Sequence, residues 1–378
     1  MIAPEFFVKQ LQSRGIDFFT GVPDSLLKGF CAYISSHLKP ENHIIAANEG
    51  GAVALAAGYH LASGRIAGVY MQNSGIGNAV NPLLSLVDRE VYNIPMLLII
   101  GWRGEPGVKD EPQHVKQGKT TISLLDTMGI KNAVLSDDNT LCAKQIDDAI
   151  SYIETTNEVF AFVVKKDVFE NQSSDISTHE NEYILPRESA IQTVVDNLGE
   201  RDIVVSTTGM ISRELFEYRE ERREGHQHDF LTVGSMGHAS QIALGIALQK
   251  AERRVWCFDG DGASIMHLGN LAIVGSKGAR NLVHVVFNNG AHDSVGGQPT
   301  AGFLIDLPQI ALACGYSSVF SESESENLKQ VLDKIKQLDG PIFLEIKVKK
   351  GARKNLGRPT TTPLQNKQAL MNCLSDRL

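Results

Sequence analysis

The chain has 378 residues, of which 42% are hydrophobic and 21% are charged, and its formal net charge is −8. This length is too great for one compact core and predicts two globular domains of ordinary size. The negative charge argues against nucleic-acid binding, and any anionic ligand must be held by local groups. The longest apolar run, "IPMLLIIGW" at residues 94–102, is too short to cross a bilayer, so we expect no membrane partner.

The cysteines and the N-terminal residues bear on the cell compartment. Five cysteines are scattered along the chain without a CxxC pair. An odd, scattered set is typical of reduced thiols rather than of a disulfide framework. The first ten residues, "MIAPEFFVKQ", lack the basic and apolar pattern of a signal peptide. We therefore expect a cytoplasmic protein.

Apolar runs of strand length alternate with longer amphipathic segments along the chain. Such continuous runs are typical of strands that are buried on both faces of a parallel sheet. The runs form two series, at residues 43–47, 66–72, 95–101, 132–136 and 160–164, and then at 202–209, 229–234, 254–260, 282–289 and 341–348. The pattern predicts an α/β protein with two mostly parallel sheets, each flanked by helices.

A polar stretch, "ENQSSDISTHENEYILP", separates the two series and has almost no apolar periodicity. We interpret it as the boundary between a first domain (1–170), a linker (171–186) and a second domain (187–350). The last segment, 351–378, shows no core-forming pattern. We expect it to be a tail that either packs across the surface or forms an ordered lid.

Acidic and amide side chains follow two strands of the second series. One strand ends in Asp259-Gly260-Asp261-Gly262, and the next ends in Asn288-Asn289. Carboxyl ends of parallel strands meet at one edge of the sheet, where ligands of such folds bind. Hard oxygen ligands suit Mg²⁺ that also holds phosphate oxygens, and Gly262 allows a phosphate to approach the N-terminus of the next helix.

Two well-known ligand-binding loops do not fit this motif. An EF-hand loop that begins at Asp259 would need a polar fifth residue and a glutamate at position twelve, where this chain has Ala263 and Asn270. The glycines do not fit the GxGxxG pattern of a dinucleotide fold. The alternative that the motif is a pair of ordinary Asx turns with a purely structural role is not excluded by the sequence.

A single acid, Glu49, precedes the small and apolar stretch "GGAVALAAGYHLASG". No second charge appears before Arg65. An acid at the start of a helix can simply favour the helix dipole. A buried acid with no charged neighbour can also share its proton with a ligand.

The spacing of Gly-Asp-Gly and Asn-Asn resembles the signature of the thiamine diphosphate enzymes. The resemblance implies two domains of the thiamine diphosphate-binding fold, of which the first binds the pyrimidine and the second the diphosphate. It assigns Mg²⁺ to Asp261, to Asn289 and to the carbonyl of Ala291. Because the spacing is one residue longer than the family's commonest one, Asn288 stays open as a ligand. The diphosphate contacts fall on the motif residues Gly260, Gly262 and Ala263.

The stretch "TVGSMGHASQIALGIAL" supports this resemblance. The family places a carbonyl that accepts from the cofactor's amino group at Gly234, with Ser235 next to it. The family also places an apolar side chain that wedges beneath the two cofactor rings, here Met236. Taken alone, Met236 could simply fill the core.

The resemblance also implies a role for Glu49. In this family the cofactor's aminopyrimidine removes a proton from its own thiazolium ring, and a glutamate at the pyrimidine nitrogen promotes the required tautomer. Glu49 fits that position. Because family members bind the cofactor between the first domain of one subunit and the second domain of another, we expect a homo-oligomer with active sites at subunit interfaces.

Four further segments resemble the phosphonopyruvate decarboxylases, with the sulfopyruvate decarboxylases as near relatives. They are "FFTGVPDSLLKGF", "MQNSGIGNAVNPLLSL", "GWRGEPGVKDEPQH" and "LGRPTTTPLQNK". The implied substrate is a small anionic 2-keto acid, 3-phosphonopyruvate. The implied products are phosphonoacetaldehyde and carbon dioxide, as a step of phosphonate biosynthesis.

Polar residues after the strands are candidates for substrate contacts and proton transfer. We predict catalytic roles for Asp24 and His292, although His292 could be a surface loop residue. Substrate binding is predicted for Ser25, Asn73, Arg103, Gln113 and His114. Arg353, Lys354 and Arg358 are alternatives for the phosphonate if the tail closes over the site.

Three other kinds of protein share parts of this pattern. A nicotinamide or flavin oxidoreductase offers no reason for Glu49 or for the paired motifs. A catalytically inert subunit would be expected to lack Glu49 or Asp261, and both are present. A carboligase of the acetolactate-synthase type would keep every cofactor residue and stays an alternative.

Overall fold

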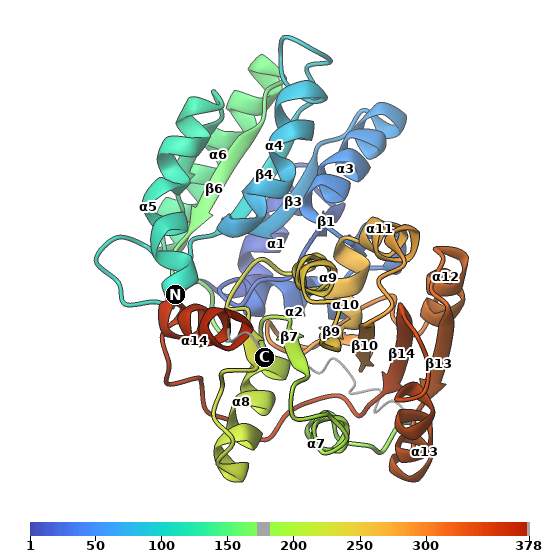
Figure 1. Cartoon of the computed structure of the whole chain (residues 1–378). Helices are drawn as coiled ribbons and strands as arrows, with labels where there is room; N and C mark the ends of the chain where they lie inside the picture. The colour runs from blue at the N-terminus through green and yellow to red at the C-terminus, as the bar shows by residue number, and fades with distance from the viewer. Residues whose placement is uncertain (172–181, 376–378) are drawn as a thin grey trace. The chain divides into compact units, whose positions relative to one another are not determined.

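The computed structural model describes residues 1–171 and 182–375 (Figure 1). The chain divides into two compact units, residues 1–178 and 179–378. The first predicted domain lies in the first unit, and the second predicted domain and the tail lie in the second. Of the predicted linker, residues 172–181 lie outside the described residues. Within the described part of the chain, no helix is both long and apolar enough to span a bilayer.

The first unit is built around one parallel six-stranded sheet of order β2-β1-β3-β4-β6-β5. Its elements in chain order are α1 (Pro4–Gln12), β1 (Phe19–Gly21), α2 (Lys28–His37), η1 (Pro40–Asn42), β2 (His43–Ile45), α3 (Glu49–Ser63), β3 (Ala67–Gln72), η2 (Asn73–Gly75), α4 (Ile76–Ser85), β4 (Met96–Gly101), α5 (Pro112–Thr127), β5 (Lys131–Val134), α6 (Asn139–Thr156) and β6 (Phe160–Val164).

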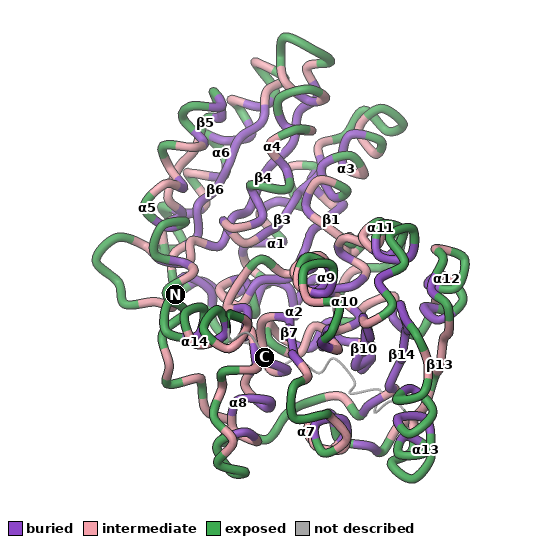
Figure 2. The backbone as a smooth tube through the Cα atoms, viewed as in Figure 1, coloured by how far each residue is buried: buried purple, intermediate pink, exposed green. Residues whose placement is uncertain are grey.

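Helices cover both faces of this sheet, because alternate residues of each strand point to opposite sides. Leu97 and Ile99 of β4 join a core with α1, α2 and α6, whereas Leu98 and Ile100 join a core with α3, α4 and α5. The central strands β3, β4 and β6 are therefore buried on both faces, as their purple colour in Figure 2 shows. This explains the continuous apolar runs in the sequence.

The second unit contains a parallel six-stranded sheet of order β13-β14-β10-β9-β7-β8 and a two-stranded antiparallel ribbon, β11-β12. Its elements are α7 (Arg187–Val195), β7 (Ile203–Ser206), α8 (Met210–Arg222), β8 (Asp229–Leu231), α9 (Ala239–Gln249), β9 (Val255–Gly260), α10 (Asp261–Met266), α11 (Gly269–Lys277), β10 (Leu282–Asn288), β11 (Ala291–His292), β12 (Gln298–Pro299), α12 (Leu307–Ala313), β13 (Ser318–Glu322), α13 (Ser325–Ile335), β14 (Ile342–Lys347) and α14 (Pro363–Ser375).

The two units share one topology. When the six main strands of each unit are numbered in chain order, both sheets read 2-1-3-4-6-5. The direction of the connections reverses between the first and third strands, and ligands of such sheets bind beyond the carboxyl ends at that point. In the first unit this point lies between β1 and β3, and in the second between β7 and β9.

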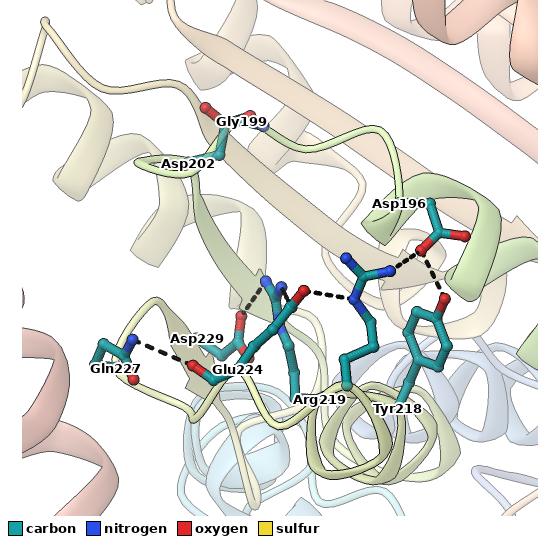
Figure 3. A network of polar contacts seen from close by, with 9 residues as sticks. Asp196, Gly199, Asp202, Tyr218, Arg219, Glu224, Gln227 and Asp229 are labelled. Carbon is teal, nitrogen blue, oxygen red and sulfur yellow. Dashed lines mark hydrogen bonds and ion pairs between the residues drawn. The ribbon is translucent and has the colours of Figure 1, made fainter.

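Ion pairs hold α8 next to β8 in the second unit (Figure 3). The guanidinium of Arg219 donates to both oxygens of buried Asp229, at 3.0 Å each, and to Glu224 at 2.6 Å. The hydroxyl of Tyr218 donates to Asp196 at 2.6 Å. These contacts fix the C-terminal half of α8 relative to the sheet.

The tail contains one helix that packs on the same sheet edge. In α14, the side chain of Asn366 accepts from the Leu231 N–H at 3.0 Å and donates to the Asp229 carbonyl at 2.8 Å. Leu370 is buried in the core with α9 and α12. This part of the tail therefore packs against β8.

The predicted fold class is confirmed, and the apolar runs identified in the sequence do not include two main strands, β1 and β13. β1 has only three residues. The edge strand β13 has a half-exposed burial pattern and a polar sequence, "SVFSE". Continuous apolar runs identify strands that are covered on both faces, and β13 is not one of them.

Candidate active site

In the first unit, Glu49 opens α3 directly after β2. Asn48 caps this helix by accepting from the Gly51 N–H at 2.8 Å, which leaves Glu49 in the first turn. The Glu49 side chain is 5% exposed, and its Oε2 accepts from the amide of Asn78 at 2.7 Å. A β-carbon at Gly75 would lie 2.3 Å from Glu49 Oε1, so only glycine fits beside this carboxyl group.

Asp24 lies at the carboxyl end of β1 and is fully buried. It accepts from Gln72 Nε2 at 2.5 Å and from the Leu26 N–H at 2.7 Å. Burial raises the pKa of Asp24, although these hydrogen bonds and the charge of Arg103 oppose the shift. Ser74 in turn donates to Gln72 at 2.7 Å. Asp24 is thus a carboxyl group that can hold a proton at the sheet edge.

Of the predicted substrate residues, Arg103 is hydrogen-bonded to both Ser25 and Asn73. Arg103 Nη1 donates to Ser25 Oγ at 2.8 Å. Asn73 donates to the Arg103 carbonyl at 2.8 Å and accepts from the Arg103 N–H at 3.2 Å. Asn73 is also hydrogen-bonded to Thr121 at 2.9 Å. The structure therefore gathers these three residues at the ends of β1, β3 and β4.

Asp110 is a member of this cluster that the sequence analysis missed. Arg103 donates to its two carboxylate oxygens at 2.8 and 2.5 Å, and the guanidinium holds the pKa of Asp110 well below its usual range. Burial opposes this shift. Nothing in the loop sequence "VKDEP" distinguishes Asp110 from an ordinary solvent-exposed acid.

Gln113 and His114 begin α5 next to this cluster. His114 is buried. A β-carbon at Gly104 would lie 2.0 Å from the His114 carbonyl, so the loop packs directly on the helix. The side-chain oxygen of Gln113 is buried and has no hydrogen-bond partner among the described residues. An orphaned buried amide of this kind needs a partner, which a bound ligand can supply.

In the second unit, Asp261 opens the six-residue helix α10 directly after β9. It is 2% exposed and accepts a short hydrogen bond from the Thr300 hydroxyl. Burial raises the pKa of Asp261 to about 6, while the Thr300 hydrogen bond and backbone N–H groups lower it. Thr300, in the stretch "GGQPTAG", was missed because it follows no strand of the main sheet.

The two asparagines at the end of β10 point into different surroundings. Asn288 is fully buried and donates to the Gly302 carbonyl and to Glu345, both at 2.8 Å. Asn289 donates to Asp293 at 2.6 Å and accepts from the Ala291 N–H at 3.0 Å.

Gly302 lies between Asp261 and Asn288. A β-carbon there would lie 2.5 Å from Asp261 Oδ2 and 2.6 Å from Asn288 Oδ1, so both oxygens flank this glycine. Carboxylate, carboxamide and hydroxyl oxygens meet here. This all-oxygen donor set fits Mg²⁺.

Asp259, one residue before this turn, is held by three donors. The Gly260 N–H, Ser264 Oγ and His284 Nε2 lie 3.0, 3.1 and 3.3 Å from its carboxylate oxygens. Cys257 lies beside Asp259 and His284, but burial raises the pKa of its thiol well above the usual range. These residues therefore orient the turn that begins at Gly260. Cys257 does not supply a thiolate.

The loop that carries Gly234, Ser235 and Met236 joins β8 to α9. Ser235 has a left-handed backbone, and Thr208 donates to the Val233 carbonyl at 2.9 Å. Met236 is only half-buried, so it does not fill the core.

His292 in β11 lies against the glycine turn, because its Cε1 is 3.0 Å from the position of a β-carbon at Gly262. Burial lowers the pKa of His292 to about 4, so the imidazole is neutral at neutral pH. His292 is half-buried and lies in a strand, so it is not an exposed loop residue.

Two family models match the chain, one in each unit. The thiamine pyrophosphate enzyme N-terminal TPP binding domain matches residues 1–129, and the C-terminal TPP binding domain matches residues 207–346.

Similar proteins cover almost the whole chain. A phosphonopyruvate decarboxylase of Streptomyces viridochromogenes is 34% identical in an alignment that covers 97% of this chain and 93% of that protein. The phosphonopyruvate decarboxylase of Streptomyces hygroscopicus is 33% identical, with 96% and 92% covered. A sulfopyruvate decarboxylase of Methanosarcina acetivorans is 26% identical, with 92% and 91% covered.

Proposed function

The chain belongs to the thiamine pyrophosphate enzymes, and on that premise we propose that it decarboxylates 3-phosphonopyruvate to phosphonoacetaldehyde and carbon dioxide. The observation that carries the proposal is the similarity to two phosphonopyruvate decarboxylases over 97% and 96% of this chain. The product aldehyde would serve phosphonate biosynthesis.

Thiamine diphosphate is the proposed cofactor, and it supplies the electron sink for the bond that breaks. Glu49 would hold a proton at the pyrimidine nitrogen, which its burial beside Gly75 supports. Gly234 would accept from the cofactor's amino group, with Ser235 beside it, and Met236 would support the rings. Gly260, Gly262 and Ala263 would lie against the diphosphate.

Mg²⁺ is the proposed metal. Asp261, the carbonyl of Ala291 and a carboxamide oxygen of Asn289 or Asn288 would hold it. The burial that raises the pKa of Asp261 supports this, because a buried carboxyl group is stabilised in its charged form by a cation.

The substrate is proposed to meet the cluster of Ser25, Asn73, Arg103, Gln113 and His114. The unpaired oxygen of Gln113 supports a ligand there. Asp24 and His292 would handle protons, Asp24 as a carboxyl group whose pKa is raised by burial and His292 as a neutral imidazole.

We further propose a cytoplasmic homo-oligomer with active sites at subunit interfaces. All five cysteines are free thiols, which supports a reducing compartment. Each of the two family domains corresponds to one unit of the chain, and the proposal that a second copy completes the site follows from the family resemblance alone.

Carbon dioxide release from phosphonopyruvate, sulfopyruvate and pyruvate tests the proposal, each with and without thiamine diphosphate and Mg²⁺. We expect cofactor-dependent release that is fastest with phosphonopyruvate. Release from none of the three acids would overturn the proposed function.

Sulfopyruvate is the second candidate substrate. The similarity to the sulfopyruvate decarboxylase, 26% identity over 92% of this chain, favours it. A higher kcat/KM for sulfopyruvate than for phosphonopyruvate would select it.

A further inference from the structure

The second unit contains a cavity of about 300 Å³ between the start of α8 and the beginning of the tail. Met210 and Arg213 of α8 line one side, and the tail residues Arg353 and Lys354 line another. Asp293, from the loop after β11, completes the wall. The volume is at the lower end of the range for small-molecule sites.

The charges around this cavity favour an anion. Its lining carries three basic side chains, those of Arg213, Arg353 and Lys354, and one acidic side chain, Asp293. Asp293 is already paired with buried Arg187, at 2.9 Å. Arg353 is itself paired with Glu188 and Glu217, so a ligand with two negative charges would meet Arg213 and Lys354 here, although the whole chain has a net charge of −8.

The tail wall of the cavity is held in place by specific contacts. The Gly351 N–H donates to Asp293 at 3.0 Å, and Arg353 is paired with Glu188 at 2.9 Å and with Glu217. Farther along, Asn366 anchors α14 to β8. The cavity is thus a built feature of the second unit.

The cavity also adjoins the candidate metal site. The Asp293 oxygen that meets Arg187 and Gly351 also accepts from Asn289 at 2.6 Å. Only the side chain of Asp293 would therefore separate an anion in the cavity from Asn289, a candidate ligand of Mg²⁺.

We propose that this cavity holds the phosphonate group of the substrate through Arg213 and Lys354. The proposal rests on the proposed function and names the group that recognises the anionic end of the substrate. It adds a subsite in the second unit to the cluster around Arg103, whose guanidinium already donates to both oxygens of Asp110.

Two variants test the subsite, Lys354→Met and Arg213→Met, with Lys367→Met as matched control. Lys367 is an exposed lysine of the same tail and lies outside the cavity lining. Each cavity variant should raise the KM for phosphonopyruvate roughly 10-fold, because a charge-assisted contact is lost. The KM for pyruvate, which lacks the phosphonate, should stay unchanged, and Arg213→Lys should recover part of the loss.

Calorimetry with phosphonoacetate gives a readout that does not need turnover. Lys354→Met should weaken its binding about as much as it raises the KM, and Lys367→Met should not change it. Inorganic phosphate is titrated in parallel. If Lys354→Met weakens phosphate binding but leaves the KM for phosphonopyruvate unchanged, the cavity is an unrelated phosphate site and the proposal is wrong.

The two proposals fail differently. If the wild-type enzyme decarboxylates phosphonopyruvate and both cavity variants keep its KM, the subsite is wrong and the function stands. If the wild-type enzyme releases carbon dioxide from no acid, the function is wrong, and the substrate subsite falls with it whatever phosphonoacetate does.

Discussion

The carboxylate of Asp293 accepts a 2.6 Å hydrogen bond from the carboxamide of Asn289. The same oxygen meets Arg187 at 2.9 Å and the Gly351 N–H at 3.0 Å. This one acceptor thereby joins the end of β10, the start of α7 and the beginning of the tail. Groups that orient a metal ligand in this way affect metal affinity without touching the ion.

Asp293→Asn should therefore weaken Mg²⁺ binding roughly 10-fold, because Asn289 loses its charged acceptor. Calorimetric titration of the thiamine diphosphate-loaded protein with Mg²⁺ measures this. Asp333→Asn removes only an exposed acid and serves as the control. Asp261→Ala should abolish Mg²⁺-dependent cofactor binding altogether. An unchanged Mg²⁺ affinity in Asp293→Asn would show that Asn289 does not need this acceptor.

Glu49→Gln should retain thiamine diphosphate binding and lower kcat by a factor on the order of 100 or more, because the amide keeps the shape but cannot share a proton. Calorimetry follows the binding, and carbon dioxide release follows kcat. Glu41→Gln, at an exposed acid of the same unit, should behave like the wild type. Full activity of Glu49→Gln would remove Glu49 from the catalytic group.

Asp24→Asn should gain thermal stability relative to the wild type as the pH rises above about 4, the ordinary pKa of an aspartate. Because burial raises the pKa of Asp24 in the folded protein, the folded state holds its proton at a pH where the unfolded chain has lost it. The wild type therefore loses stability as the pH rises above this value, and the variant does not.

Thermal unfolding of both proteins over a range of pH values measures the effect, with Asp148→Asn, at an exposed acid, as control. A difference in Tm that is constant with pH would contradict the raised pKa.

If Asp24 also transfers a proton to or from the substrate, Asp24→Asn should lower kcat more than it changes the KM.

Arg103→Met should raise the KM for phosphonopyruvate several-fold, because Ser25 loses its 2.8 Å contact and the cluster loses its guanidinium. It should also destabilise the protein, since partly buried Asp110 loses its partner. Steady-state kinetics and thermal unfolding separate the two effects.

The double variant Arg103→Met/Asp110→Asn distinguishes a substrate role from a structural one. It removes the unpaired carboxylate, so stability should return while the KM stays high. If the KM recovered together with stability, Arg103 would act only by holding its loop in place.

The local pattern of the sequence was sufficient for the longer central strands and for the turns that carry Glu49 and Asp261. These strands are buried on both faces, so nearly every residue in them is apolar, and polar residues stand out where each strand ends. The edge strand β13 has one half-exposed face and left no such signal.

The hydrogen-bond partners of the candidate residues could not be predicted from the sequence. Asp110 lies 7 positions from Arg103 and faces it across a loop that packs on α5 at Gly104. Thr300 is 39 positions from Asp261, and Gly351 is 58 positions from Asp293. No periodicity links residues that far apart, since the loops between them are not constrained by a repeating backbone.

The sequence by itself determined the α/β class, the two domains and the residue types at the strand ends, because burial and backbone periodicity act locally. The tertiary structure alone decided which of those residues meet. It turned Asn288 toward Glu345 and Asn289 toward Asp293, and it placed the tail against α8 to form a cavity. These pairings depend on how distant segments pack, which is decided only when the whole sheet and its helices have come together.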